Sequence, residues 1–124
     1  EDLPALWNAK MQEYLQITPK NDAEGILQDM HWSDGSFGYF PSYLLGSIYD
    51  GMYLDAVEEE LGSVDTLLAE GKIGEITKWL NEKIHQYGST REPKEVIEKV
   101  CRKEVTAEPL VRYFTEKYTK VYDL

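Results

Sequence analysis

The chain has 124 residues, of which 42% are hydrophobic and 29% charged, and its formal net charge is −10. This length fits one domain with a modest core. The negative charge argues against nucleic-acid and anionic-membrane partners, because binding phosphates needs a basic patch. No apolar run approaches the roughly 20 residues that span a bilayer. The single cysteine, Cys101, excludes an internal disulfide, so we expect a reducing compartment, the cytoplasm.

Apolar residues recur at intervals of three and four over most of the chain, which is the pattern of amphipathic helices. We expect a first helix from Leu3 to about Gln16, because Thr18 precedes a proline and is disfavoured in the α region. Further helices are expected over 41–61, 73–87, 93–101 and from about 109 to 121, with a short one over 64–70 that Ser63 can cap. The sequence therefore predicts an all-α fold of about five helices, with residues 1–124 forming a single helical segment.

The expected helix over 41–61 carries apolar side chains around much of its circumference. Its main stripe is Leu45, Ile48, Tyr49, Met52 and Ala56, and its other apolar residues are Tyr43, Leu44, Tyr53, Leu54 and Val57. Such a helix is typical of the middle of a larger protein, and large exposed apolar patches tend to become interfaces. We therefore expect the chain to self-associate through this helix, with Tyr53 or Leu54 in the contact.

Residues 22–40 follow neither the helical nor the strand period. They include three glycines, four acidic residues, one histidine and four aromatic residues, and turn-forming residues dominate 33–36. A long irregular loop of this composition in a helical domain commonly serves function. A surface connection whose aromatic side chains fill the core explains the composition equally well.

The stretch Gly25-Ile26-Leu27-Gln28-Asp29-Met30-His31-Trp32 matches the pattern G-x-x-Q-D-x-H-W. This stretch, its continuation to Tyr43 and the segment Pro4-Ala5-Leu6-Trp7-Asn8 resemble the carboxypeptidase Taq family of zinc metallocarboxypeptidases. Residues 93–97 and the closing residues 113–118 resemble the family's last pair of helices. The resemblance covers nearly the whole chain and is sharpest over 25–43.

The resemblance implies a largely helical fold with a deep groove, an active site on the groove floor and a dimeric assembly. The family holds zinc with H-E-x-x-H on a helix and a downstream Glu, and removes residues from the carboxy termini of peptide substrates. This chain has neither H-E-x-x-H nor the family's H-P-F, D-x-R-x-T and I-R-x-x-A-D signatures. We therefore expect the carboxy-terminal segment of such an enzyme, inactive by itself, with zinc bound elsewhere in the parent and no metal ligand here. The alternative is a standalone helical protein-interaction domain.

His31 is the main candidate for a functional residue. The resemblance places its motif beside the active-site groove, which implies a contact with the substrate or transition state rather than with zinc. An imidazole can donate a hydrogen bond to a developing oxyanion. The alternative is a histidine that binds loop carbonyls and holds the turn together. Asp29 could orient this imidazole or cap the turn, and the sequence favours neither role.

The other candidates offer hydrogen bonds or apolar surface. The Gln28 amide could bind substrate or backbone, and we expect backbone. Tyr39 and Tyr43 could bind a peptide through their hydroxyls. Tyr39 is preferred because Tyr43 is expected at the start of a helix whose apolar stripe is buried. The remaining aromatic residues of the loop are expected to fill the core and support the site: Trp32, Phe37 and Phe40.

Overall fold

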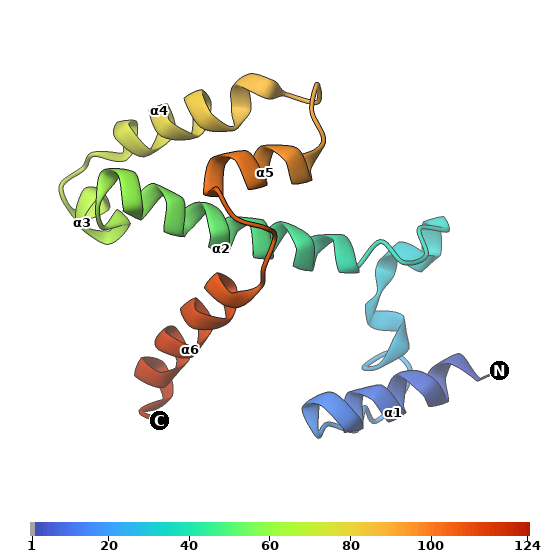
Figure 1. The fold of residues 1–124 in the computed structure, drawn as a ribbon. Helices are drawn as coiled ribbons and strands as arrows, with labels where there is room; N and C mark the ends of the chain where they lie inside the picture. Colours follow the sequence, from blue (N-terminus) through green and yellow to red (C-terminus); the bar gives the residue numbers. More distant parts are fainter. Residues whose placement is uncertain (1) are drawn as a thin grey trace. The chain divides into compact units, whose positions relative to one another are not determined.

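The computed structural model describes residues 2–124, and within them it contains helices and no strands (Figure 1). The six α-helices are α1 (Leu3–Leu15), α2 (Pro41–Leu61), α3 (Val64–Ala69), α4 (Ile73–Lys83), α5 (Pro93–Cys101) and α6 (Glu108–Tyr122). Three short 3₁₀ helices are η1 (Ile26–Gln28), η2 (Met30–Asp34) and η3 (His85–Tyr87). The predicted all-α fold is confirmed, and the expected number of about five helices becomes six when the short α3 is counted.

The predicted boundaries agree with the structure within about two residues except at one helix. The helix expected over 73–87 ends at Lys83, because Ile84 leaves the helical conformation with φ −123° and ψ −62°. The chain then continues as η3. At α3, the Ser63 hydroxyl accepts a hydrogen bond from the Thr66 N–H at 3.3 Å, which is the predicted cap.

The chain divides into two compact units, an amino-terminal unit (1–43) and a carboxy-terminal unit (44–124). In the amino-terminal unit, α1 packs on η1, and Ile26 is buried. A Cβ at Gly25 would lie 3.3 Å from Asn8 Oδ1 of α1 and 3.3 Å from the Pro19 side chain. The loop therefore lies close to α1 at the start of the G-x-x-Q-D-x-H-W motif.

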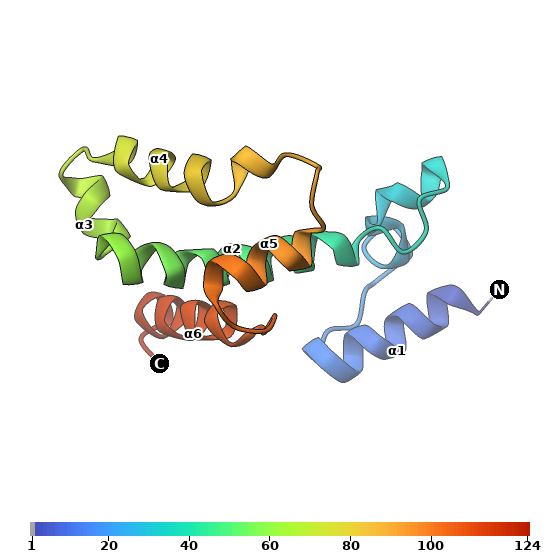
Figure 2. The same ribbon diagram turned by 45° about the horizontal axis from the view of Figure 1, so that its top comes forward.

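The core of the carboxy-terminal unit forms where α4, α5 and α6 pack around α2 (Figures 1 and 2). Ala56 and Val57 of α2 pack with Trp79 of α4, while Met52 and Ile97 are fully buried. A Cβ at Gly51 would lie 2.9 Å from the backbone nitrogen of Leu110, so α2 and α6 approach each other closely there.

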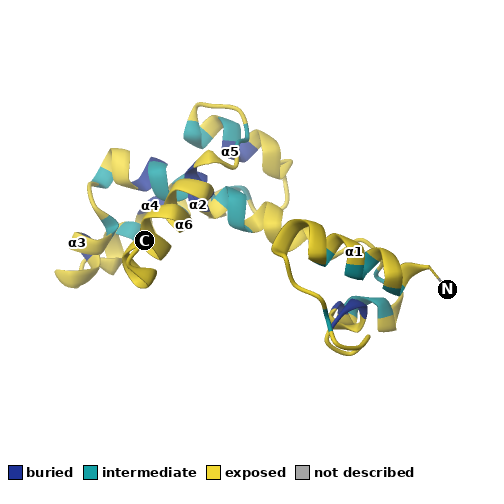
Figure 3. Ribbon diagram, turned by 90° about the horizontal axis from the view of Figure 1, so that it is seen from below, coloured by how far each residue is buried: buried dark blue, intermediate teal, exposed yellow. Residues whose placement is uncertain are grey.

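Burial on α2 differs from the predicted stripe. The buried residues of α2 are Gly51, Met52, Ala56 and Val57, whereas Leu45 is 50% exposed. The prediction for Leu45 is wrong because the packing of the other helices against α2 begins near its middle. Beyond Leu110, α6 is exposed along its length (Figure 3). Among residues 2–124, no helix combines the length and apolar character needed to cross a membrane.

Candidate functional site

The loop before α2 is organised by its two short 3₁₀ helices. Asp29 separates them in an extended conformation with φ −80° and ψ 91°. Gly35 ends η2 with φ 85°, a left-handed conformation that glycine adopts without strain. The Ser42 N–H then donates to the Tyr39 carbonyl at 2.9 Å and starts α2. These turns bring residues 29, 31, 39 and 43 together.

Asp29 binds His31 in two ways at once. Its Oδ1 accepts a hydrogen bond from the His31 backbone N–H at 3.2 Å and lies 2.7 Å from His31 Nδ1. Asp29 is 6% exposed and is the one charged residue among the described residues to be buried. Capping the turn and orienting the imidazole were alternatives from the sequence, and the structure shows both.

The His31 ring lies among aromatic side chains. Ring centroids are 4.9 Å away at Tyr39, 5.6 Å at Tyr43 and 6.0 Å at Phe40. The Tyr43 hydroxyl is 3.4 Å from His31 Nε2. Within the described residues, the ring nitrogens therefore bind the side chains of Asp29 and Tyr43, and the alternative of loop carbonyls as partners does not match this geometry.

Both tyrosines reach the surface. Tyr43 is 57% exposed and Tyr39 is 49% exposed, and their rings are 5.6 Å apart. The expectation that Tyr43 is buried together with the stripe of its helix is wrong, because Tyr43 belongs to the first turn of α2, well before the first buried residue. The reason for preferring Tyr39 to Tyr43 therefore disappears.

Of the remaining candidates from the sequence, Gln28 and Trp32 contact other parts of the amino-terminal unit, whereas two phenylalanines are exposed. Gln28 Nε2 donates to the Ala23 carbonyl at 2.5 Å, in line with the expected backbone role. Trp32 is half-buried and faces α1. Phe37 and Phe40 are 70% and 47% exposed, so the expectation that they fill the core is wrong. The amino-terminal unit is too small to enclose every aromatic side chain of its loop.

A second carboxylate lies near His31. Hydrogen bonds from the side chain and backbone of Ser36 hold the pKa of Asp34 below its usual value, and the charge of His31 acts in the same direction. The sequence alone did not indicate that Asp34 belongs to the groups around His31. Its position in the Ser33-Asp34-Gly35-Ser36 turn, directly after the motif, was the available signal.

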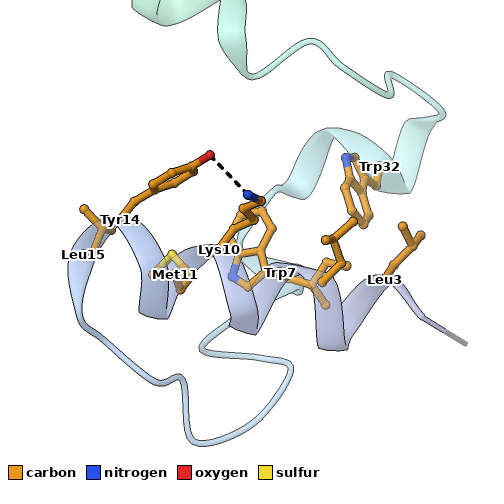
Figure 4. Close-up of a pocket in the computed structure, with 9 residues that line it drawn as sticks. Leu3, Trp7, Lys10, Met11, Tyr14, Leu15 and Trp32 are labelled. Carbon is orange, nitrogen blue, oxygen red and sulfur yellow. Dashed lines mark hydrogen bonds between the residues drawn. The ribbon is translucent and has the colours of Figure 1, made fainter.

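A cavity of about 340 Å³ lies against α1, lined by one face of this helix together with Ile26 and Trp32 (Figure 4). At its edge, Lys10 donates a hydrogen bond to the Tyr14 hydroxyl at 3.3 Å. Trp7 Nε1 is shielded from solvent, and no residue of the described chain accepts its hydrogen bond. The lining suits apolar side chains, whereas the groups capable of acid–base chemistry surround His31.

A catalytic zinc site needs three protein ligands that converge on one ion. Among residues 2–124, no group of three His, Cys, Asp or Glu side chains is placed to hold a metal. His31 Nδ1 binds Asp29, and His85 Nδ1 lies 2.9 Å from Asn81 Oδ1.

Known proteins are similar to this chain over nearly its whole length. The sequence model of the carboxypeptidase Taq (M32) metallopeptidase family matches residues 1–118. Carboxypeptidase 1 of Bacillus subtilis (strain 168) is 46% identical over 122 residues, which are 98% of this chain and 24% of that protein. Thermostable carboxypeptidase 1 of Pyrococcus furiosus is 39% identical over 118 residues, which are 95% of this chain and 24% of that protein.

A solved structure also matches this chain over nearly its whole length. Trypanosoma cruzi metallocarboxypeptidase 1 superposes with a TM-score of 0.86 at 38% identity, covering 94% of this chain and 24% of that one. The chain thus spans about a quarter of the length of the relatives that it matches. From the match over residues 1–118, the chain belongs to the carboxypeptidase Taq (M32) metallopeptidase family.

Proposed function

We propose that this chain, residues 1–124 as one segment, forms the carboxy-terminal helical part of a zinc metallocarboxypeptidase that removes residues from peptide carboxy termini. The observation that carries the proposal is the buried Asp29 holding His31 through two hydrogen bonds, with exposed tyrosines around the ring. A buried carboxylate that orients a partly exposed imidazole is a common arrangement in catalytic sites.

The peptide would bind over His31, Tyr39 and Tyr43. When a peptide bond is hydrolysed, its carbonyl oxygen gains negative charge, and hydrogen-bond donors held in place lower the energy of that state. The His31 side chain is 28% exposed, so it is accessible while its Nδ1 edge stays bound to Asp29. Gln28 and Trp32 would support the loop from behind through the Ala23 carbonyl and the α1 face.

The chain by itself would be inactive. The lack of H-E-x-x-H in the sequence and of a three-ligand group among residues 2–124 supports this. Zinc would bind to other residues of a longer protein, as the membership in a metallopeptidase family implies. The lone Cys101, which suits a reducing compartment, supports a cytoplasmic location.

The test is His31→Ala in a full-length enzyme that contains this segment. We expect kcat/KM to fall by about 10²–10³, the effect of losing one oxyanion donor. Zinc content should not change, because His31 is not a ligand. His85→Ala is the matched control, since His85 is exposed and binds Asn81, and its activity should be normal. Near-normal activity of the His31 variant, or loss of its zinc, would contradict the proposal.

A helical protein-interaction domain is the second candidate. It is favoured by the exposed leucines of α1, since Leu3, Leu6 and Leu15 are each more than half exposed. The reading frame upstream of residue 1 separates the two candidates. An in-frame H-E-x-x-H supports the enzyme, whereas a start codon directly before residue 1 supports the interaction domain.

A further inference from the structure

We propose that Asp29, His31 and Tyr43 form a hydrogen-bonded relay in which Asp29 fixes the imidazole tautomer and His31 decides whether the Tyr43 hydroxyl offers an acceptor or a donor. The relay runs from Asp29 Oδ1 to His31 Nδ1 at 2.7 Å and from His31 Nε2 to the Tyr43 hydroxyl at 3.4 Å. Its consequence for a bound peptide rests on the proposed function, but the relay itself does not.

The first step is the position of the imidazole proton. Asp29 Oδ1 already accepts the His31 backbone N–H, so this oxygen acts as an acceptor. An ionised carboxylate has no proton to donate. The contact of the same oxygen with Nδ1 is therefore a hydrogen bond in which Nδ1–H donates. In the neutral ring this leaves Nε2 without a proton.

The second step is the direction of the bond to Tyr43. An unprotonated Nε2 is an acceptor, so the Tyr43 O–H donates to it and turns its oxygen lone pairs outward. When the ring is protonated, both nitrogens are donors. Nε2–H then donates to the Tyr43 oxygen, and the Tyr43 O–H is free to donate outward. Since Tyr43 is 57% exposed, this change is presented at the surface.

The distance to Tyr43 is at the long end of the hydrogen-bond range. Catalytic hydrogen bonds are often long in the absence of substrate and tighten when it binds. The ionisable groups that contact the ring are Asp29, Tyr39 and Tyr43, and the Phe40 ring also contacts it, while Asp34 lies near enough for its charge to interact with His31.

In this relay Tyr43 contacts the peptide, whereas Asp29 acts on it through other side chains. A peptide carbonyl oxygen needs donors, and when His31 is protonated these are the Tyr43 hydroxyl and His31 Nε2–H, which the peptide oxygen then shares with Tyr43. A peptide N–H needs an acceptor, which Tyr43 supplies when His31 is neutral. Asp29 is a positioning residue in this scheme, because it acts on the peptide through His31 and Tyr43.

The experiment is nitrogen NMR of the 124-residue chain labelled at its two histidines, His31 and His85. At a pH where the rings are neutral, we expect His31 Nδ1 to show the resonance of a protonated nitrogen and Nε2 that of an unprotonated one. Asp29→Ala should release this preference and move the proton toward Nε2. Asp34→Asn removes a nearby charge without touching Nδ1 and should leave the tautomer unchanged.

Tyr43→Phe tests the second link and, since Tyr43 is exposed, should fold normally. It should shift the His31 Nε2 resonance toward that of a nitrogen without a hydrogen bond and leave Nδ1 protonated. The His85 resonances are the internal control and should not move in any variant. A neutral His31 protonated on Nε2, or an Nε2 resonance unchanged by Tyr43→Phe, would overturn the relay.

A kinetic arm separates the relay from the proposed function. In a full-length enzyme containing this segment, Tyr43→Phe should lower kcat/KM roughly tenfold, the effect of one hydrogen bond, and alter the pH profile. If His31→Ala is impaired while Tyr43→Phe has normal activity and a normal pH profile, the relay is overturned and the proposed function stands. If His31→Ala is normal while the tautomer is as expected, the proposed function fails and the relay stands.

Discussion

One carboxylate oxygen of Asp29 binds both the backbone N–H of His31, at 3.2 Å, and its ring nitrogen Nδ1, at 2.7 Å. The conformation of the turn and the orientation of the ring are therefore coupled through a single buried atom. A change that reshapes the turn also rotates the imidazole, even if it touches no surface residue.

Asp29→Ala should destabilise the amino-terminal unit. The change removes two hydrogen bonds of a buried side chain and leaves the His31 N–H without a partner, at a cost of about 2–3 kcal/mol. Urea denaturation followed by fluorescence of Trp7 and Trp32 would measure it. Asp34→Ala, at an exposed position of the same turn, is the control and should cost much less. Equal losses would mean that the Asp29 contacts contribute little to stability.

Gly51→Ala should destabilise the carboxy-terminal unit although alanine is the better helix former. The added methyl would lie 2.9 Å from the Leu110 backbone nitrogen, and backbone atoms cannot move away cheaply. We expect a loss of about 1–3 kcal/mol. Gly46→Ala is the matched control in the same helix, where nothing lies within 4 Å, and it should stabilise by roughly 0.5–1 kcal/mol. Thermal unfolding of both variants checks the pair, and a stabilised Gly51 variant would contradict the close approach of α2 and α6.

Stability at acid pH should depend on Asp55 of α2. Partial burial acts to raise the pKa of this carboxyl, but hydrogen bonds from Arg112 of α6 and from Lys103 outweigh it and hold the pKa below its usual value. A lowered folded-state pKa gives stabilisation that is present above the unfolded pKa and is lost as the pH falls through the folded one.

Arg112→Ala should therefore flatten the loss of stability below about pH 4 and should cost little near neutral pH, because exposed ion pairs contribute little to stability. Urea denaturation across this pH range is the measurement. Lys94→Ala, which breaks an exposed pair with Glu98, should leave the acid dependence unchanged. If the loss of stability at acid pH is the same with and without Arg112, then Arg112 does not lower the pKa of Asp55.

The chain should not bind zinc with useful affinity. Within residues 2–124, neither histidine belongs to a group of three His, Cys, Asp or Glu side chains that could hold one metal ion. Calorimetric titration with zinc, before and after treatment with a chelator, would check this against a family enzyme that has H-E-x-x-H. A stoichiometric sub-micromolar site involving His31, or peptidase turnover by this chain alone, would disprove it.

We expect the isolated chain to self-associate through α2, and the structure changes which residues should be tested. Tyr53 is half-buried against Ala56 and Val57, and Leu54 lines a cavity with Leu110 and Tyr113 of α6. Leu45, at 50% exposure, is the better probe. Leu45→Glu should shift an oligomer toward monomer in sedimentation, whereas Leu54→Glu should mainly destabilise the unit. A monomeric wild-type chain at high concentration would exclude the association.

The sequence by itself determined the helices, the family and the motif. Local signals are sufficient there: the spacing of apolar residues, the Ser63 cap, and the fixed letters from Gly25 to Trp32 all depend on neighbours along the chain. The positive φ of Gly35 likewise follows from local turn chemistry.

The tertiary structure decided which apolar residues are buried and which groups meet at His31. The predicted stripe of α2 placed Leu45 inward, and Tyr43 was expected to be buried at the start of the same helix. Burial depends on where other helices pack, however, and the first buried residue of α2 is Gly51, near its middle. The dual bond of Asp29 and the approach of the Tyr43 hydroxyl to His31 Nε2 depend on turns that set angles between short segments. The spacing of Asp29, His31 and Tyr43 in the sequence does not show whether their side chains meet. The backbone angles of the turns between them decide that the three side chains form one chain of hydrogen bonds.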